Sequence, residues 1–427
     1  MSQINSKLNK KITIFEGILR SYIISAVGLS IPLLISIISI PIIIRSLGLY
    51  EFGILSINLA VAGFIVLFDF GICKTFVNLS YRSKDNNKLT NKLFINSIYT
   101  LLILGFIFIL IFLIIETISN LLSHGTNSVN FHIYIEILLI SPIILISQFS
   151  KNYFESKFEF AKATMVQVIN TSSMFIGPIV AIHCGFLDIK HIIISIGFFK
   201  FISIMISFIL IANEKIKNEL SFSVKIIKDL TINYKAMTIN GISSPFLISA
   251  DRVLLGLLSG PISVGTFSAA SEFISRVFGG LGSITNILFP YYSAINSDNH
   301  KNGILFYKKT FYLYLLTCCV LFSILLIISD HINIYLFNES RDEKSIQVIY
   351  ILIVGFFFNC VAQLPCSYIY ATNKITLWSK VQIVEAIVYI PFLICMIEEK
   401  GLVGAAISLT IRLFIDLLLS IFISFKK

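Results

Sequence analysis

Charged residues are scarce in this chain of 427 residues. Lys, Arg, Asp and Glu together make up 13% of the sequence, whereas an average soluble domain carries about 25%. Hydrophobic residues make up 56%, and the mean hydropathy is +0.89. This composition excludes a single soluble core and predicts an all-α polytopic membrane protein that crosses the bilayer many times.

The sequence also lacks the signatures of the common enzymes and metal sites. It has no HExxH motif, no nucleophile elbow and no GxxxxGK[ST] phosphate loop. Its seven cysteines lie in apolar runs, without a CxxC pair or metal-ligand spacing. We therefore expect neither an enzyme nor a metal or other cofactor. Uphill transport would draw on a gradient of H+ or Na+, or on consumption of the product.

Long apolar runs fill most of the chain, and a spanning helix needs about 20 such residues. We predict about twelve spans, at residues 18–44, 52–76, 93–118, 131–150, 163–187, 190–212, 236–258, 264–290, 309–332, 346–371, 377–397 and 402–424. No cleavable signal peptide is expected, because residues 1–16 are polar and basic and the first apolar run is long enough to stay in the membrane.

The formal net charge of +10 is distributed unevenly over the loops between these spans. Lys and Arg are retained on the cytoplasmic side of membrane proteins. Placing the N-terminus on that side leaves only Arg45, Lys190, Arg341, Lys344 and Lys400 on the outer connections. We therefore predict that both termini are cytoplasmic. The basic loops would face anionic lipid headgroups, and nucleic acid is not an expected partner.

A polar segment divides the chain near its middle. We predict a six-helix bundle over residues 1–212, a cytoplasmic linker over 213–235 and a second six-helix bundle over 236–427, arranged around a central cavity. Small residues after the first and seventh spans share one spacing; they are Gly48, Gly53 and Ser56, and Gly260, Gly265 and Ser268. This match predicts an internal repeat, with halves related by an axis along the membrane normal.

Eight ionisable residues lie deep inside the predicted spans: Lys200, Arg252, Arg276, Arg412, Asp251, Glu272, Glu385 and Asp416. Each costs roughly 2.5–3.5 kcal/mol at a helix centre, so such residues normally face a partner or a water-filled path. They favour a path for something polar. The alternative is a dry interior in which Glu272 neutralises Arg276, and Asp416 neutralises Arg412, at a spacing of i to i+4.

Polar residues recur at helical spacing in several spans, which places them on one face of each helix. The clearest face carries Gly265, Ser268, Glu272, Arg276, Gly279, Ser283 and Asn286. Similar faces carry Ser408, Arg412, Asp416 and Ser420, and Gly355, Asn359, Gln363 and Ser367. We predict that the charged faces line a hydrated cleft between the bundles. Close helix packing through small residues is the alternative.

Short segments along nearly the whole chain resemble one known family. The segment RSLGLYEFG at residues 45–53 is similar to the loop after the first span of Wzx-type polysaccharide transporters. These belong to the multidrug/oligosaccharidyl-lipid/polysaccharide exporter (MOP) superfamily. Further similar segments lie at residues 69–71 with Lys74, 154–158, 251–252, 264–270 and 401–406.

The resemblance implies a flippase that moves undecaprenyl-diphosphate-linked O-antigen repeat units across the bacterial inner membrane by alternating access. A polysaccharide polymerase and a chain-length regulator are further partners that it suggests. Our candidates for contact with the diphosphate and sugars are Arg20, Lys74, Lys200, Arg252, Arg276 and Arg412. Our candidates for binding a coupling ion are Asp69, Asp251, Glu272, Glu385 and Asp416.

Other classes of protein fit the sequence less well. A multidrug or cation antiporter of the same superfamily would share the twelve spans and would use the carboxylates as its main site. A membrane glycosyltransferase or polymerase usually needs a sizeable outer loop, but the longest outer connection runs only from about 332 to 345. Residues 81–87 lack the GxxxDRxGRR pattern of a major-facilitator porter. A purely structural role would leave the embedded charges unexplained.

Overall fold

In the computed structural model of this chain the described residues form helices that are joined by short turns. These residues are 2–67, 69, 71–82, 87–123, 131–157, 159–212, 247, 249–298, 300–337, 343–372 and 374–425. The predicted linker at 213–235 and most of the predicted span 236–258 lie outside this set. The predicted division into domains therefore stays a prediction.

The helices follow one another along the described chain in an order close to the predicted spans. They are α1 (Ser2–Leu67), α2 (Ile72–Arg82), α3 (Asn87–Ser123), the 3-10 helix η1 (Phe131–Ile140), α4 (Ser141–Ser156), α5 (Phe160–His183), α6 (Ile189–Ala212), residues 249–259, α9 (Pro261–Asp298), α10 (His300–Ile327), α11 (Ser329–Phe337), α12 (Glu343–Ala371) and α13 (Ile375–Phe425).

Two of these helices each cross the membrane twice. The backbone of α1 leaves the helical conformation at Gly48, where φ is 81°, and α13 does the same at Gly401, where φ is 56°. A positive φ is readily adopted by glycine, which has no Cβ. Eight helices of the described chain are long and apolar enough to cross a membrane, with η1 and α4 taken as one. Counting α1 and α13 as two crossings each, and adding α9 and the segment 249–259, accounts for the twelve predicted crossings.

The structure corrects the predicted ends of two spans. The span predicted at 52–76 ends earlier, at Leu67, and a turn with Gly71 at φ 73° leads into α2. Asp69 stabilises this turn because its carboxylate accepts hydrogen bonds from the backbone N–H groups of Gly71 (2.7 Å) and Cys73 (3.4 Å). The span predicted at 309–332 is also different, since α10 ends at Ile327 and a separate short helix, α11, follows.

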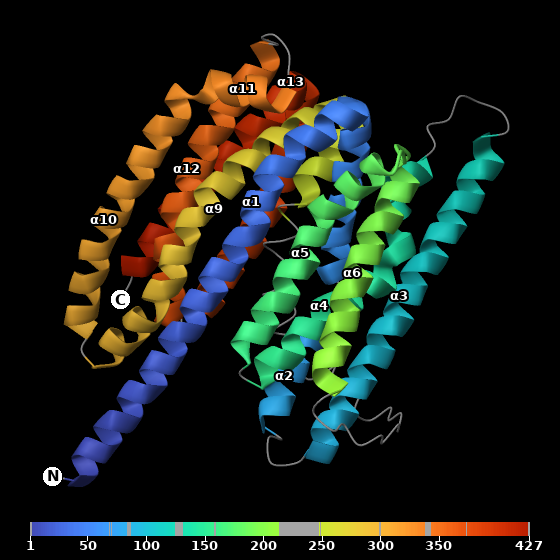
Figure 1. The fold of residues 1–427 in the computed structure, drawn as a ribbon. Helices are drawn as coiled ribbons and strands as arrows, with labels where there is room; N and C mark the ends of the chain where they lie inside the picture. Colours follow the sequence, from blue (N-terminus) through green and yellow to red (C-terminus); the bar gives the residue numbers. More distant parts are fainter. Residues whose placement is uncertain are drawn as a thin grey trace.

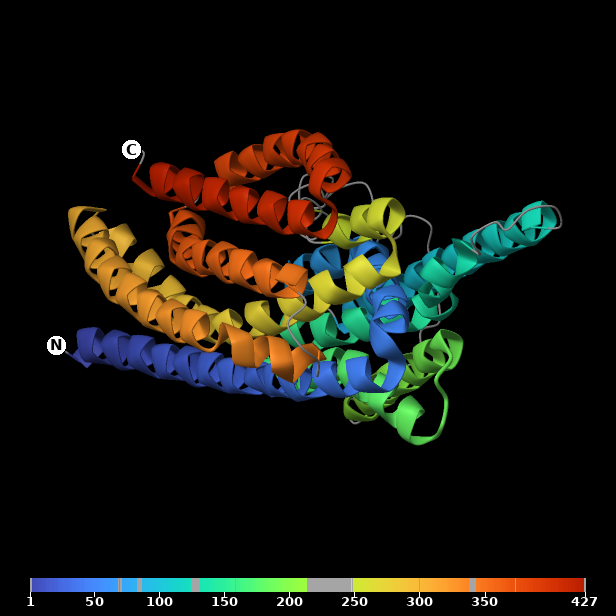
Figure 2. The ribbon, with the colours of Figure 1, turned by 90° about the horizontal axis from the view of Figure 1, so that it is seen from above.

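The two halves of the sequence gather on different sides of the molecule. Figure 1 shows α9, α10, α12 and α13 on one side, α2 to α6 on the other, and the long α1 between them. The view from above in Figure 2 shows the same separation, with α3 reaching outward from its group. The N-terminus and the C-terminus both lie away from the end of the molecule that carries α11 (Figure 1).

A glycine seam joins the second arm of α1 to α9. A Cβ added at Gly53 would overlap the carbonyl group of Pro261, lying 2.6 Å from its carbon, and one at Gly265 would overlap the carbonyl oxygen of Leu49. Small residues permit such close approach of membrane helices. Gly48 and Gly260, at the start of each arm, share a φ of 81°. The two segments that share one spacing in the sequence therefore share one backbone conformation, and the second glycine of each approaches the backbone of the other helix.

The short helix α11 contacts the first arm of α1 and α9. Arg45 of α1 donates a hydrogen bond to the backbone carbonyl of Tyr335 (2.9 Å), and the Tyr335 hydroxyl donates to the carbonyl of Ile37 (3.4 Å). The Tyr335 ring also packs against Phe273 of α9, with ring centroids 5.9 Å apart. Because α11 follows α10, it ties α1 to the C-terminal half at the end of the molecule opposite the termini.

Candidate functional site

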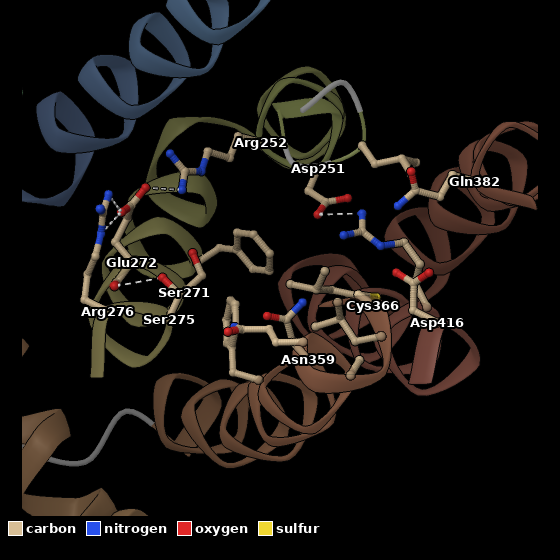
Figure 3. Close-up of a pocket in the computed structure, with 18 of the residues that line it drawn as sticks. Asp251, Arg252, Ser271, Glu272, Ser275, Arg276, Asn359, Cys366, Gln382 and Asp416 are labelled. Atoms are coloured by element: carbon tan, nitrogen blue, oxygen red, sulfur yellow. Dashed lines mark hydrogen bonds and ion pairs between the residues drawn. The ribbon is translucent and has the colours of Figure 1, made fainter. Parts of the chain in front are cut away.

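A polar cavity of about 430 Å³ lies among the helices of the C-terminal half (Figure 3). Its lining comes from Leu247, Asp251 and Arg252 and from residues of α9, α12 and α13. Its charged and polar lining residues are Asp251, Arg252, Ser271, Glu272, Ser275, Arg276, Asn359, Gln363, Gln382, Arg412 and Asp416. Six of the eight ionisable residues predicted inside spans therefore meet at one cavity.

A smaller cavity of about 100 Å³ lies between the two halves. It is lined by residues of α1 and by Met174 and Phe175 of α5. It shares Arg252, Glu272 and Arg276 with the larger cavity. These three side chains therefore separate the polar interior of the C-terminal half from the surface where the halves meet.

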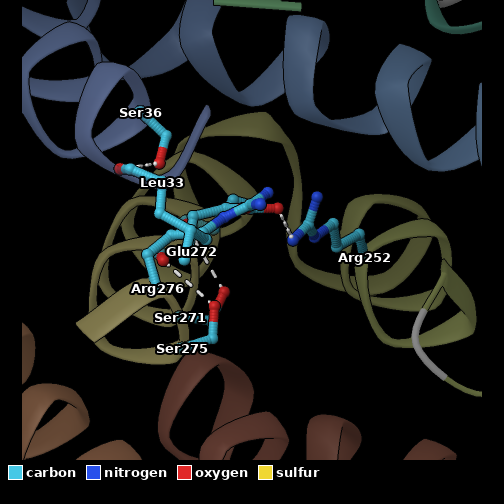
Figure 4. Close-up of polar contacts among 8 residues, drawn as sticks. Leu33, Ser36, Arg252, Ser271, Glu272, Ser275 and Arg276 are labelled. Atoms are coloured by element: carbon cyan, nitrogen blue, oxygen red, sulfur yellow. Dashed lines mark hydrogen bonds and ion pairs between the residues drawn. The ribbon is translucent and has the colours of Figure 1, made fainter. Parts of the chain in front are cut away.

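Arg252, Glu272 and Arg276 form an ion triad (Figure 4). Glu272 accepts a short hydrogen bond from Nη2 of Arg252 through its Oε1 atom. Its Oε2 atom accepts from Nη2 (2.7 Å) and Nε (3.1 Å) of Arg276. The guanidinium of Arg276 also lies 5.4 Å from the centre of the Phe175 ring, across the boundary between the halves. Two guanidinium groups against one carboxylate leave the triad one positive charge in excess.

Arg412 is the centre of a second, more deeply buried cluster. Its guanidinium lies 4.0 Å from Oδ2 of Asp251 and 3.9 Å from Oε1 of Glu385. The Tyr389 hydroxyl donates a hydrogen bond of 2.6 Å to Oδ1 of Asp251, and Arg412 stacks over the Tyr389 ring at 5.0 Å. Asp416 lies beside Glu385. Three carboxyl groups thus surround one guanidinium.

This second cluster leaves several polar atoms without hydrogen bonds. Within the described chain, Nε and Nη1 of Arg412, both carboxyl oxygens of Glu385 and Oδ1 of Asp416 are buried and have no hydrogen-bond partner. Most buried polar atoms in proteins do have one. The distances from Arg412 to its carboxylates also exceed those of a normal hydrogen bond. The cluster is therefore close enough for electrostatic attraction but loosely bonded.

The structure answers the question of whether the embedded charges pair or line a cavity, because they do both. Glu272 and Arg276 pair as their spacing suggested, and both still border the polar cavity. Arg412 and Asp416 interact electrostatically, as their spacing suggested, but no ion pair within 4.0 Å joins them among the described residues. The ion pairs of Arg412 within 4.0 Å are instead with Asp251 and Glu385, which come from other turns and helices.

The remaining predicted site residues lie elsewhere. Lys200 of α6 is only 3% exposed, and its Nζ donates hydrogen bonds to the side-chain (2.8 Å) and backbone (3.2 Å) oxygens of Asn170 in α5. It does not border the polar cavity. Asp69 is occupied with the turn before α2. The side chains of Arg20 and Lys74 lie outside the described part of the structure.

Several residues of the site were missed in the sequence, among them Ser271 and Ser275 of α9 and two residues of α13. Tyr389 bonds Asp251, and Gln382 lines the polar cavity; both belong to the first arm of α13. Together with Glu385 they recur at steps of three and four residues, which is the spacing of one helix face. That periodicity was the available signal, but it contains a single charged residue.

Twelve crossings, with a charged cavity among those of the C-terminal half, are typical of a membrane transporter, and solved structures share the fold. A structure described as the inward-facing conformation of a multidrug resistance MATE family transporter of the MOP superfamily aligns with a TM-score of 0.73. The alignment has 14% identity and covers 94% of this chain and 97% of that one. The lipid II flippase MurJ, in an inward closed conformation, aligns with a TM-score of 0.67 and 16% identity over 96% of this chain and 87% of that one.

The chain belongs to the polysaccharide biosynthesis protein family, whose sequence profile matches residues 18–296. It is 26% identical over 407 residues to a Shigella flexneri protein named "Putative O-antigen transporter", covering 94% of this chain and 96% of that protein. The predicted helical membrane fold and the family resemblance are thereby confirmed. The matches are to transporters, which also confirms the expectation of a transporter in place of an enzyme.

Proposed function

We propose that this protein is a flippase that moves undecaprenyl-diphosphate-linked O-antigen, or related polysaccharide, repeat units from the inner to the outer leaflet of a bacterial inner membrane. The proposal is supported by the family and by the name of the Shigella flexneri relative. The observation that carries it is the ion triad of Arg252, Glu272 and Arg276, whose excess positive charge borders a polar cavity. Guanidinium groups bind phosphate oxygens through their planar fork of donors.

The cavity suits the head group of such a lipid better than its chain. A diphosphate and its sugars are too polar for hydrocarbon, and the cavity offers them arginines together with Asn359, Gln363 and Gln382. The hydrocarbon chain can stay outside the protein while the head group crosses. Alternating access then requires the two halves to rock about the cavity.

The glycine seam supports a direction for this movement. In the orientation predicted from the Lys and Arg residues, both termini are cytoplasmic and the turns at Gly48 and Gly260 lie at the outer face. The seam at Gly53 and Gly265 would then close the outer side of the molecule. A head group would enter this state from the cytoplasm. Export would require the seam to open.

Asp251, Glu385 and Asp416 are the residues that we propose to bind the coupling ion. They bring three carboxyl groups together around Arg412, and several of their oxygens accept no hydrogen bond within the described chain. A proton or Na+ bound there would offset the excess negative charge of this cluster. Hard cations such as Na+ are bound by oxygen ligands of this type.

A multidrug or cation antiporter is the alternative function. It is favoured by the same carboxyl cluster, because three carboxyl groups exceed one guanidinium there. The two functions differ in which charges they need. A flippase for a diphosphate depends on the arginines of the triad, whereas a cation antiporter depends on the carboxylates and is indifferent to the excess positive charge.

The test is complementation of a strain that lacks the gene, with surface polysaccharide and drug resistance measured together. Arg276→Ala removes the excess positive charge and the two hydrogen bonds to Glu272. A charged hydrogen bond from the Arg276 guanidinium to a phosphate oxygen would be worth about 1.5–3 kcal/mol, so its loss should lower transport by about tenfold or more. Arg276→Lys should restore part of it.

Lys162→Ala is the matched control, because Lys162 is a surface cation paired with Glu159 (2.9 Å) and does not border the polar cavity. It should leave surface polysaccharide unchanged. Normal polysaccharide from Arg276→Ala at equal protein level would refute the diphosphate contact. Failure of the wild-type chain to restore polysaccharide, together with drug resistance that Glu385→Gln abolishes, would establish the antiporter instead.

A further inference from the structure

The guanidinium of Arg276 is held by contacts from both halves of the molecule. Its edge donates hydrogen bonds to Glu272, one turn earlier on α9, through Nε (3.1 Å) and Nη2 (2.7 Å). Its face lies over the ring of Phe175 in α5, 5.4 Å from the ring centre. The hydrogen bonds that the described chain forms with this guanidinium do not use Nη1. Arg276 is therefore fixed in orientation while part of its fork of donors stays available.

Phe175 brings an aromatic face to a place where positive charge is in excess. It is only 8% exposed and lines the smaller cavity between the halves. Outside the ion triad, the lining of this cavity is apolar except for Ser56. A ring face attracts a cation most strongly where water is excluded. The ring therefore offsets part of the positive charge that the single carboxylate of Glu272 leaves uncompensated.

The backbone of Phe175 is anchored in the N-terminal half. Two residues further along α5, the carbonyl of Gly177 accepts a hydrogen bond from the Ser195 hydroxyl of α6 (2.9 Å). A Cβ added at Gly177 would lie 2.8 Å from the Cα atom of Ile196. Helices that approach this closely are tightly packed. Phe175 therefore moves with α5 and α6, whereas Arg276 moves with α9 in the other half.

We propose that Phe175 is a positioning residue for the diphosphate, which holds the Arg276 guanidinium in place for the phosphate oxygens and releases it when the two halves separate. This inference rests on the proposed flippase function and adds the residue that makes binding depend on conformation. The two contacts of Arg276 are compatible. The ring covers the face of the guanidinium, and phosphate oxygens bind its edge, in the guanidinium plane.

The origin of Phe175 in the opposite half has a consequence for transport. The head group binds more tightly while the halves are in contact at this boundary, and less tightly once α5 has moved away from α9. A ligand distinguishes two conformations only through such a difference in affinity. The opening that export requires thus weakens the site at which the head group was bound. An aliphatic side chain would fill the same space without attracting the cation, so the aromatic character of Phe175 is what matters.

The experiment measures binding of undecaprenyl diphosphate to the purified full chain in vesicles, with undecaprenol as a probe that lacks the phosphates. Mono-, di- and trifluorinated phenylalanine at position 175 weaken the negative ring face in steps and change its shape little. Affinity for undecaprenyl diphosphate should fall with each added fluorine, and Phe175→Leu should lower it about 2- to 30-fold. Binding of undecaprenol should not change. Met174→Leu is the matched control, because Met174 lines the same small cavity, and it should bind undecaprenyl diphosphate normally.

A double variant tests whether the ring acts through the guanidinium. Phe175→Leu should cause no further loss of affinity in an Arg276→Ala background, since the cation that it positions is then absent. Equal affinity across the fluorinated series, or the same loss from Phe175→Leu in both backgrounds, would overturn the proposal and mark Phe175 as a packing residue.

The flippase function is tested separately by the wild-type chain and by Arg276→Ala alone. Tight binding of undecaprenyl diphosphate by the wild type and weak binding by Arg276→Ala, with a flat fluorinated series, would refute the role of Phe175 and leave the proposed function intact. Wild-type binding of undecaprenyl diphosphate no tighter than that of undecaprenol would refute the diphosphate site itself.

Discussion

Replacing Gly53 with Ala should push α1 and α9 apart where they cross at the glycine seam. The added Cβ would lie 2.6 Å from the carbonyl carbon of Pro261, whereas ordinary contact begins at 3.4 Å. The two helices must therefore separate by roughly 0.8 Å or more at this point. The contacted atoms of Pro261 belong to the backbone and the alanine Cβ is fixed to its Cα, so no side chain can rotate to make room.

The energetic cost of this overlap falls on the state in which the seam is closed. Overpacking of this kind costs about 1–3 kcal/mol, and a bias of that size changes a conformational equilibrium about 5- to 150-fold. The cost disappears where the seam is open. Gly53→Ala should consequently raise the population of the state open at that face. Gly265→Ala should act in the same direction, because its Cβ would overlap the carbonyl oxygen of Leu49.

Accessibility of the polar cavity from outside the cell is the measurement. Ser275→Cys, in a chain whose native cysteines are replaced, places a thiol on the cavity lining. A maleimide that cannot cross the membrane should label it several-fold faster in the Gly53→Ala background. Gly279→Ala is the matched control on α9, because a Cβ added there has no neighbour within 4 Å. Equal labelling of the Gly53→Ala, Gly279→Ala and parent proteins would show that the seam does not seal the cavity.

Two further substitutions separate structural from transport roles. Tyr389→Phe removes the 2.6 Å hydrogen bond to Asp251 and leaves a buried carboxylate oxygen unbonded; it should lower stability by about 1–3 kcal/mol. A Tm in detergent equal to that of Tyr312→Phe, a change at a 70% exposed residue, would contradict this. Lys200→Met should lower the Tm by leaving Asn170 without its partner, yet preserve surface polysaccharide, because Lys200 does not border the polar cavity. Reduced transport at an unchanged Tm would instead support a contact between Lys200 and the substrate.

The fold could be predicted from the sequence because each membrane crossing requires a long run of apolar residues. Apolar runs of the required length fixed about twelve spans, and Gly48 marked the first turn between them. The same signal could not show where each span stops. Leu67 ends a helix inside an apolar run because Asp69 and Gly71 form a turn there, which is a matter of local hydrogen bonds.

Part of the candidate site could also be predicted from the sequence. Embedded charges are costly, so their presence alone identified Arg252, Glu272, Arg276 and Arg412 as candidates. The ion-pair partners of these residues could not all be predicted, because spacing within one helix reveals only neighbours on that helix. It gave the pair of Glu272 with Arg276, but Arg252 approaches from a preceding helix and no local rule could place it.

Arg412 and Lys200 show the limits of such rules. Arg412 has an acidic residue four positions away, yet tertiary packing directs its guanidinium toward Asp251 and Glu385. Lys200 looked available because it has no local carboxylate. In the folded chain an amide, Asn170, satisfies it, and neutral polar partners of this kind are hard to recognise in a sequence.

The turns at Gly48 and Gly401 have a mechanical consequence. Each joins two membrane crossings through one non-helical residue, so neither α1 nor α13 contains any slack. A longer loop would let one crossing tilt while its neighbour stayed in place. Here the ends of the two arms that meet at Gly48, and those that meet at Gly401, must move together, and each glycine is the point at which the angle between its arms can change.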